Sequence, residues 1–255
     1  MKTYSTLKIV NRHLNYDHVT LTNPSPHYYI HIALEIDHSP FPFFLFESKL
    51  KKKILKKATL FCSEVLKYSN VIEANVFKAL LIPPGKGKYI DENSHKVPIA
   101  KFDIALLIKV NSKEALTQLI NHQYFKNSLI FFEKNSIHFH YTTAKNIRRI
   151  DDVDHAKQGV FLFNYFYAED VEQNLEVWNY TAGWFEKETK LNNSELMLPL
   201  NKNVSNYTVI NHCRWDTLID ILPSLLFKKT FKLYVLDNFY TNNVGAMPIL
   251  YKLIT

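Results

Sequence analysis

The sequence predicts an α+β protein made of two tandem ferredoxin-like units. Each unit runs strand–helix–strand–strand–helix–strand, and the two sheets pack face to face as a closed or nearly closed barrel. Three observations predict this class. Residues 160–185 change from an extended apolar run to apolar steps of three and four, which marks a strand feeding an amphipathic helix. The same order of elements is expected on both sides of residue 150. A polar segment that ends in glycine, DDVDHAKQG, separates the two at residues 151–159.

The first domain is expected over residues 1–150. Ser48 can cap a helix at residues 49–68, because its apolar residues form one stripe and its lysines lie on the other side. Ser112 can cap the second helix, and a polar loop opens after Pro83. The expected strands are residues 28–36, 71–83, 102–110 and 137–143.

The second domain is expected over residues 160–255. Its helices are expected at residues 171–190 and about 220–239, with Pro223 tolerated in the first turn of the second helix. Its strands are expected at residues 160–168, 195–200, 207–215 and 249–254. The recurrence rests on element order and spacing rather than on residue identity. Each sheet must cover its bare apolar face, and two such halves in one chain can do so against each other.

Composition excludes several function classes. The chain has 255 residues, 47% of them hydrophobic and 14% aromatic, and only 5 glycines, with no glycine-rich phosphate-binding motif. Its two cysteines, Cys62 and Cys213, lie far apart, as expected for free thiols in a reducing compartment. Neither a signal peptide nor an apolar run long enough to span a bilayer is evident, so we expect a soluble, cytoplasmic protein.

Much of the net charge of +7 comes from residues 49–57, KLKKKILKK. A solvated helix face explains this segment, and no nucleic acid or membrane is expected among the partners. The competing hypothesis is a nucleic-acid or membrane-surface binder. It requires the lysines to continue into a wider basic patch with exposed aromatic residues.

Polar residues interrupt two of the apolar strands in the second domain. Strand alternation places Asn164 on one face with Leu162 and Phe166. It places Asn211 with Cys213 and Trp215, opposite His212 and Arg214. A buried amide needs a hydrogen-bond partner, which for Asn164 is either a ligand oxygen or a neighbouring group in a core network.

His212 and Arg214 are the candidate catalytic residues. Histidine can act as a general base near neutral pH, and arginine can hold a carboxylate or a developing oxyanion. The alternative is a helix-facing or rim position, with Arg214 in a salt bridge to Glu186 or Asp216. His138 and His140 also share one strand face, about 7 Å apart, but no third ligand is placed near them, so no metal site is expected.

The stretches VFLFNYF, EVWNYTAGWF and YTVINHCRWD resemble the dimeric α/β-barrel superfamily, to which antibiotic-biosynthesis-type and haem-degrading monooxygenases belong. In that family the first strand can carry an asparagine that faces the cavity, and the third strand can end in tryptophan. Asn164 and the Trp215-Asp216 pair match these positions. The resemblance implies a tandem duplication in one chain, with an internal ligand pocket, and in some members of the family that pocket supports cofactor-independent oxygenation of electron-rich aromatic substrates. No histidine occurs in residues 225–239, where the haem-degrading branch supplies its iron ligand, so no cofactor is expected.

The function expected from the sequence is a monooxygenase-like enzyme that acts on a small aromatic or hydrophobic molecule. The expected ligand-binding residues are Asn164, Phe166, Asn211 and Trp215. The alternative is a non-catalytic ligand-binding or interaction protein on the same fold, since fold analogy cannot choose between them. A homodimer is the assembly considered.

Overall fold

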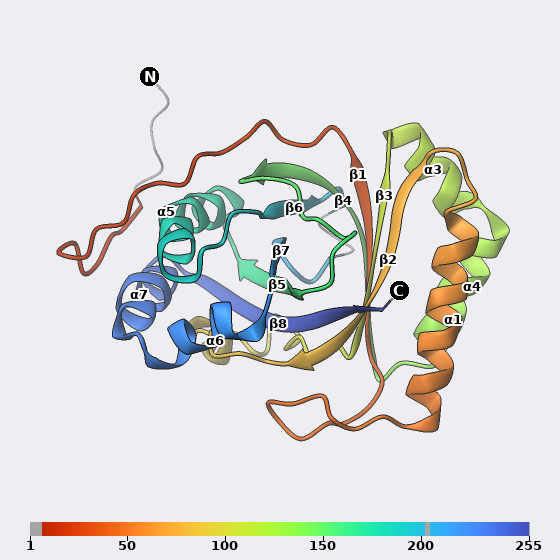
Figure 1. The fold of residues 1–255 in the computed structure, drawn as a ribbon, viewed down its shortest axis with the longest axis horizontal. Coiled ribbons are helices and arrows are strands. Elements are labelled where there is room, and N and C mark those ends of the chain that lie inside the picture. Colours follow the sequence, from red (N-terminus) through yellow and green to blue (C-terminus); the bar gives the residue numbers. More distant parts are fainter. Residues whose placement is uncertain (1–6, 202–204, 255) are drawn as a thin grey trace.

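The computed structural model describes residues 7–201 and 205–254. Eight antiparallel strands form a closed barrel in the order β1-β3-β2-β8-β5-β7-β6-β4 (Figure 1). The elements of the first half are β1 (Tyr28–Glu35), α1 (Lys49–Val65), β2 (Val71–Leu81), α2 (Lys88–Glu92), β3 (Ile104–Val110), α3 (Lys113–Asn121), α4 (Gln123–Lys134) and β4 (His138–Arg149). Those of the second half are β5 (Val160–Ala168), α5 (Val171–Thr189), β6 (Glu195–Pro199), β7 (Val209–Trp215), α6 (Leu218–Phe227), the π-helix η1 (Phe231–Leu236), α7 (Asp237–Thr241) and β8 (Val244–Ile254).

The predicted fold class is confirmed. Within each half the strands lie in the order second, third, first, fourth, which is the ferredoxin-like order. The second strand of each half then pairs with the fourth strand of the other, through β2–β8 and β4–β6. These two seams leave no open edge in the barrel. The division into two separate domains stays a prediction.

The elements form where local chemistry favours them. Ser48 and Ser112 accept hydrogen bonds from the first turns of α1 and α3, as expected. Asp170 caps α5 in the same way, by accepting from the backbone of Glu172 and Gln173. Gly183 lies in the middle of α5, where a Cβ would stand 1.9 Å from the Asp17 carbonyl oxygen. The N-terminal segment therefore crosses α5 at a point that only glycine permits.

Several boundaries differ from the expected ones. The polar loop after Pro83 contains the short helix α2, and the second helical region of the first half is divided into α3 and α4 at His122. Strands β4 and β8 are longer than expected. Their additional residues pair with the neighbouring strands β6 and β5 in the barrel wall. The last helical region begins at Leu218, contains Pro223 and is interrupted before η1.

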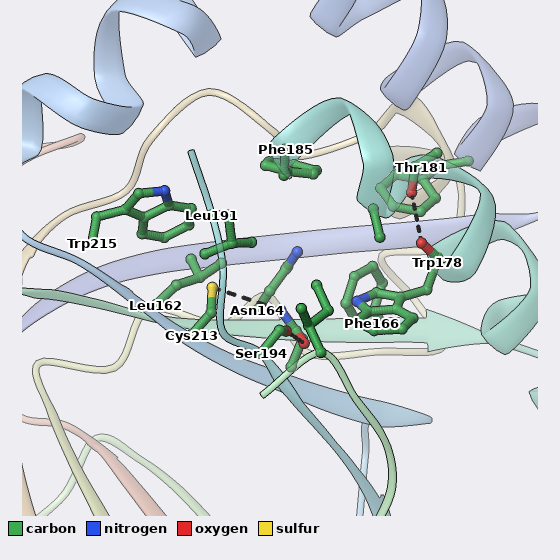
Figure 2. A pocket seen from close by; sticks show the side chains of 14 residues that line it. Leu162, Asn164, Phe166, Trp178, Thr181, Phe185, Leu191, Ser194, Cys213 and Trp215 are labelled. Atoms are coloured by element: carbon green, nitrogen blue, oxygen red, sulfur yellow. Dashed lines mark hydrogen bonds between the residues drawn. The ribbon is translucent and has the colours of Figure 1, made fainter. Parts of the chain in front are cut away.

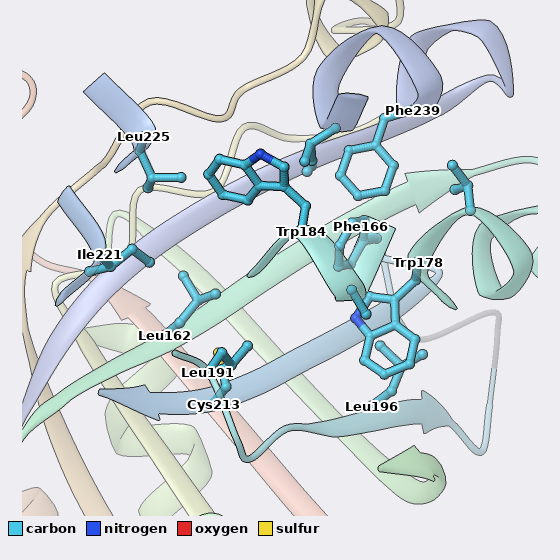
Figure 3. Close-up of a cluster of buried hydrophobic side chains, with 14 of the residues drawn as sticks. Leu162, Phe166, Trp178, Trp184, Leu191, Leu196, Cys213, Ile221, Leu225 and Phe239 are labelled. Atoms are coloured by element: carbon cyan, nitrogen blue, oxygen red, sulfur yellow. The ribbon is translucent and has the colours of Figure 1, made fainter. Parts of the chain in front are cut away.

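Three layers of buried side chains follow from this topology. Helices α1, α3 and α4 cover the outer face of the first half, and α5, α6 and α7 cover that of the second (Figure 1). The second layer includes all three tryptophans of the chain, of which Trp178 and Trp184 are labelled in Figure 3 and the third is Trp215. The barrel interior is filled by large side chains that include Phe77, Phe161, Phe163, Tyr165 and Tyr251, all fully buried.

Candidate functional site

A cavity of about 40 Å³ lies between the outer face of β5 and β7 and helix α5 (Figure 2). Aromatic and aliphatic side chains form most of its wall, from β5, α5, β7 and α7. Its lining residues are Ile150, Leu162, Asn164, Phe166, Trp178, Thr181, Ala182, Phe185, Leu191, Ser194, Asn211, Cys213, Trp215 and Phe239. We refer to it as the α5 pocket.

Two amides from adjacent strands supply the polar part of the wall. Asn164 and Asn211 are directly opposed in the β5–β7 register. The amide of Asn211 has partners, because its Oδ1 accepts from Ser194 Oγ at 2.7 Å and its Nδ2 approaches Cys213 Sγ at 3.9 Å. Asn164 Oδ1 is buried and has no hydrogen-bond partner among the described residues. Leaving such a group unpaired costs on the order of 1–3 kcal/mol, so this position is suited to a polar group of a ligand.

Other polar side chains of the pocket form hydrogen bonds within the protein, and none of the lining residues carries a charge. Trp215 Nε1 donates to Thr189 Oγ1 at 3.0 Å, and Thr181 Oγ1 donates to the Val177 carbonyl at 2.8 Å. Cys213 is the only ionisable residue in the lining, and burial raises the pKa of its thiol well above the usual value. The α5 pocket is therefore an uncharged, aromatic-walled cavity with one free polar position.

A second cavity of about 30 Å³ adjoins the α5 pocket. The two share Leu162, Asn164, Phe185 and Phe239 in their walls. The second cavity is also lined by Phe231, Val235 and Leu236 of the π-helix η1. π-Helical turns are frequent at functional sites, where the extra residue per turn displaces side chains from ordinary helical packing.

The structure brings the four expected ligand-binding residues together. Asn164, Phe166, Asn211 and Trp215 all line the α5 pocket. Their expected location inside the barrel is wrong, because their face of the sheet turns outward to the helices (Figures 2 and 3). The residues that alternate with them, Phe161, Phe163 and Tyr165, fill the barrel interior instead.

His212 and Arg214 lie on the opposite face of β7 from the α5 pocket, and neither lines it. Arg214 occupies the rim, where its guanidinium donates to the Gln158 carbonyl and pairs with Asp216 at 2.9 Å, as the salt-bridge alternative predicted. His212 is fully buried inside the barrel. The six candidate residues therefore do not form a single site.

His212 belongs to a hydrogen-bonded chain that reaches the mouth of the barrel. Its Nδ1 lies 2.9 Å from the Leu162 carbonyl, and its Nε2 lies 2.8 Å from His155 Nε2. The carbonyl can only accept, so His212 donates through Nδ1 and accepts through Nε2. His155 therefore donates through Nε2, and its Nδ1 lies 2.6 Å from Glu73 Oε2. His155 thus links His212 to the Glu73 carboxylate.

The pKa shifts agree with this arrangement. Burial, followed by the charge of His155, lowers the pKa of His212 well below its usual value, so His212 is neutral. Burial tends to raise the pKa of Glu73, but its bonds to His155 and the charge of Lys109 outweigh burial and lower it. The Glu73 carboxylate and the His155 ring are in hydrogen-bond contact at the mouth of the barrel.

An open groove of about 570 Å³ lies over this contact and includes Glu73, Asn75, Lys109 and His155 in its wall. Lys109 Nζ lies between Glu195 and Glu73 carboxylate oxygens at 3.7 and 4.0 Å. Glu73, Lys109 and His155 were not predicted from the sequence as site residues. His155 lies in the segment expected to be only a linker, and it meets Glu73 from 82 positions away. The one sequence feature that could have indicated this site is Glu73, a charged residue within the largely apolar strand β2.

His138 and His140 do not converge with a third ligand, and no cluster of three metal-binding side chains occurs in residues 7–201 and 205–254. His140 lies in the barrel interior with its Nε2 unpartnered in the described structure. Likewise, none of the described helices is long and apolar enough to span a bilayer. The cytoplasmic location stays a prediction.

No family model matches the sequence, and no curated protein matches it either. Solved structures do match. One is described as an anthrone oxidase-like protein, with a TM-score of 0.65 and 11% identity, covering 91% of this chain and 92% of that chain. Another is a proposed monooxygenase from Fusobacterium nucleatum, with a TM-score of 0.53 and 8% identity, covering 90% of this chain and 92% of that chain. At these identities the likeness shows the fold, and the chain has the dimeric α/β-barrel fold with both halves in one polypeptide.

Proposed function

We propose that this protein is a cofactor-independent, monooxygenase-like enzyme that binds a small aromatic or hydrophobic molecule in the α5 pocket. One observation carries the proposal: Asn164 Oδ1, which has no partner in the part of the chain that the structure describes, lies in a largely apolar, aromatic-walled cavity. Ligand sites typically combine such walls with a few placed polar groups that fix orientation. The likeness to an anthrone oxidase-like protein and to a proposed monooxygenase supports the same class.

The chemistry that fits this wall is oxidation of an activated methylene by dioxygen. Without a cofactor, the substrate itself must supply the electrons. A CH₂ group and O₂ give a C=O group and one water, so atoms and electrons balance with no external reductant. The methylene must be acidic, because the α5 pocket contains no base in its ionised form. The Asn164 Oδ1 would accept a hydrogen bond from the enol or phenol hydroxyl of the substrate and so fix its orientation, and the apolar wall would exclude water.

No step is derived through haem. None of the residues that line the α5 pocket is a histidine, so the wall offers no imidazole to hold haem iron.

The pocket must open to admit a substrate. A cavity of 40 Å³ is far smaller than the roughly 150 Å³ that holds benzene in a protein core. Phe185 is half-buried and lines both adjoining cavities, so rotation of its ring would join them. We therefore propose that the substrate enters between α5 and η1, the two elements that line the second cavity beside Phe185.

A second candidate function is ligand binding without catalysis. It is favoured by the lack of an ionised residue in the lining, where Cys213 is the only titratable group. His212 and Arg214 lie across the sheet from this pocket, so neither can take part in a reaction of a ligand bound there. Assembly as a homodimer is part of the proposal, and light scattering in solution tests it.

The test compares the wild type with Asn164→Leu in binding to anthrone and to the smaller 1-naphthol. Trp178 and Trp215 line the pocket, so binding should quench tryptophan fluorescence. Asn164→Leu should weaken binding at least about tenfold, as expected for loss of one hydrogen bond in a dry site. Asn174→Leu is the matched control, because Asn174 is another buried, unpartnered amide of the α5 layer that does not line the pocket.

Oxygen uptake and mass spectrometry of the product then separate the two candidate functions. Uptake of O₂ with a product that gains one oxygen and loses two hydrogens supports the enzyme. Saturable binding without uptake supports the binding protein. Equal affinity in the wild type and in Asn164→Leu would overturn both.

A further inference from the structure

The loop between β1 and α1 exposes an unusual amount of apolar surface. Phe41, Leu45 and Phe46 expose 77%, 80% and 57% of their surface, and Phe43 exposes 47%. Single exposed apolar residues are normal on soluble proteins, but contiguous groups of large ones mark interaction sites. Four such residues within six positions form what we call the apolar tip, residues 41, 43, 45 and 46.

The backbone holds this tip in place. The Phe44 amide donates to the Leu80 carbonyl at 3.0 Å, and the Ile82 amide donates to the Pro42 carbonyl at 2.8 Å. The Phe44 side chain turns inward and is buried. The loop therefore extends the end of β2 and projects from one end of the molecule, at the bottom of Figure 1. Phe43 and Leu45, the neighbours of Phe44 in the sequence, instead face solvent.

Exposed lysines follow the apolar tip directly in the sequence. Helix α1 begins at Lys49, beside the loop in Figure 1, and the side chains of Lys49, Lys52, Lys53 and Lys56 are exposed. No acidic residue lies in its first turn, and the helix N-terminus adds partial positive charge. Lys51 is not part of this charge, because it is buried and paired with Asp103 at 2.6 Å. Glu47, the acid between the tip and the helix, is paired with Lys78 at 2.6 Å.

We propose that the apolar tip and the first two turns of α1 dock on the surface of an anionic lipid bilayer. Phenylalanine and leucine side chains enter the headgroup–acyl boundary, while lysines beside them meet anionic headgroups. Attraction of the lysines to the anionic surface and burial of the apolar side chains both strengthen such binding. This is peripheral binding, which the absence of a spanning helix among the described residues does not address.

The proposal departs from the sequence-based expectation that no membrane is a partner. That expectation depended on the lysines being an isolated solvated face. The structure adds exposed aromatic residues beside them, which is one of the two conditions for a surface binder; the other is a basic patch wider than the lysines of α1. A membrane fits better than a nucleic acid. Proteins that bind single-stranded nucleic acid typically use a positively charged groove that follows the phosphate backbone, with aromatic side chains on which the bases stack. The apolar tip is a projecting loop instead.

The test is co-sedimentation with phosphatidylcholine vesicles, with and without phosphatidylglycerol. Wild type should bind only the anionic vesicles, and added salt should weaken the binding. Phe41→Ser/Leu45→Ser and Lys52→Glu/Lys53→Glu should each bind at least about tenfold more weakly. All four residues are exposed, so the melting temperature should stay within about 2 °C.

Phe227→Ser and Lys126→Glu are the matched controls. Phe227 is as exposed as Leu45, at 80%, and lies at the end of α6, while Lys126 is exposed on α4. Both should bind vesicles as the wild type does. The proposal is overturned if wild type ignores anionic vesicles or if the Phe227 control loses binding equally. It is also overturned if the tip instead mediates self-association in light scattering or binding to a single-stranded oligonucleotide.

Discussion

The two halves of the barrel bury polar side chains beneath their helices in opposite ways. In the first half, Lys51 donates to Asp103 Oδ1 at 2.6 Å and to the Phe46 carbonyl at 3.1 Å. Asp103 Oδ2 accepts from the backbone amides of Ile36 and Asp37. In the second half, Asn164 Oδ1 and both amide atoms of Asn174 are buried with no partner among the described residues.

The packing around these polar side chains also differs, because the first half is packed with apolar side chains where the second half has cavities. The outward residues of β1 and β3 pair as Ile30–Ile108, Ile32–Leu106 and Leu34–Ile104, all fully buried. Phe61 packs on Phe125 and Phe132 over this surface, with ring centroids 5.5 and 5.6 Å apart. The matching face of β5 and β7 carries the Asn164–Asn211 pair, and cavities lie beside it. A satisfied polar group is structural, whereas an unsatisfied one beside a cavity is available to a ligand.

The largest effect should come from giving the first half the polar pattern of the second. Ile32→Asn removes a fully buried side chain and introduces an amide with no partner, so we expect a loss of about 4 kcal/mol or more in the free energy of unfolding. Urea denaturation measures it. Ile32→Val is the control and should cost only about 0.5–1.5 kcal/mol. A loss below about 2 kcal/mol for Ile32→Asn would mean that the first half also tolerates a free amide, and the contrast would fail.

Breaking the satisfied ion pair should be almost as costly. Lys51→Met leaves the Asp103 carboxylate buried without its cation, which should cost about 3–5 kcal/mol. Lys52→Met, on the exposed side of the same helix turn, should stay within about 0.5 kcal/mol. Similar values for the two variants would show that the Lys51–Asp103 pair does not stabilise the fold.

The barrel interior provides a pH-dependent check, because it buries the His140 imidazole, whose Nε2 has no partner within residues 7–201 and 205–254. Burial lowers the pKa of His140 well below 6.5, so below that pH the unfolded state binds a proton that the folded state does not. Stability should therefore fall as pH drops below about 6.5, by up to about 1.4 kcal/mol per pH unit for this residue. His140→Phe should remove that part of the slope while changing stability little at pH 8.

The control for this prediction is His38→Phe, since the His38 side chain is 81% exposed. It should leave the pH slope of the urea midpoint unchanged. An unaltered slope in His140→Phe would show that His140 protonates equally well in the folded state.

The smallest effect should be a gain. Asn164→Leu replaces an unpartnered amide with an apolar side chain of similar volume, so we expect the free energy of unfolding to rise by about 1 kcal/mol. A gain in stability together with loss of ligand binding is the combination expected of a binding residue. A clear loss of stability would instead identify Asn164 as part of the structural core.

Much of the fold could be predicted from the sequence. The change of apolar period at Ala168 and Val171 located a strand and a helix, and Asp170 provided the cap. Alternation also determined which residues share a face, so Asn164, Phe166, Asn211 and Trp215 were grouped correctly. These features depend on local spacing and backbone geometry, which a linear sequence contains.

Which face turns inward was decided only by the tertiary structure. Both faces of β5 and β7 are apolar enough to be buried, and the choice depends on how the two seams close the barrel. The chain from Glu73 through His155 to His212 was equally hidden, because it joins residues from β2, the inter-half segment and β7. The sequence thus determined the elements and their faces, whereas long-range pairing decided what each face meets, because burial and hydrogen bonding depend on neighbours distant along the chain.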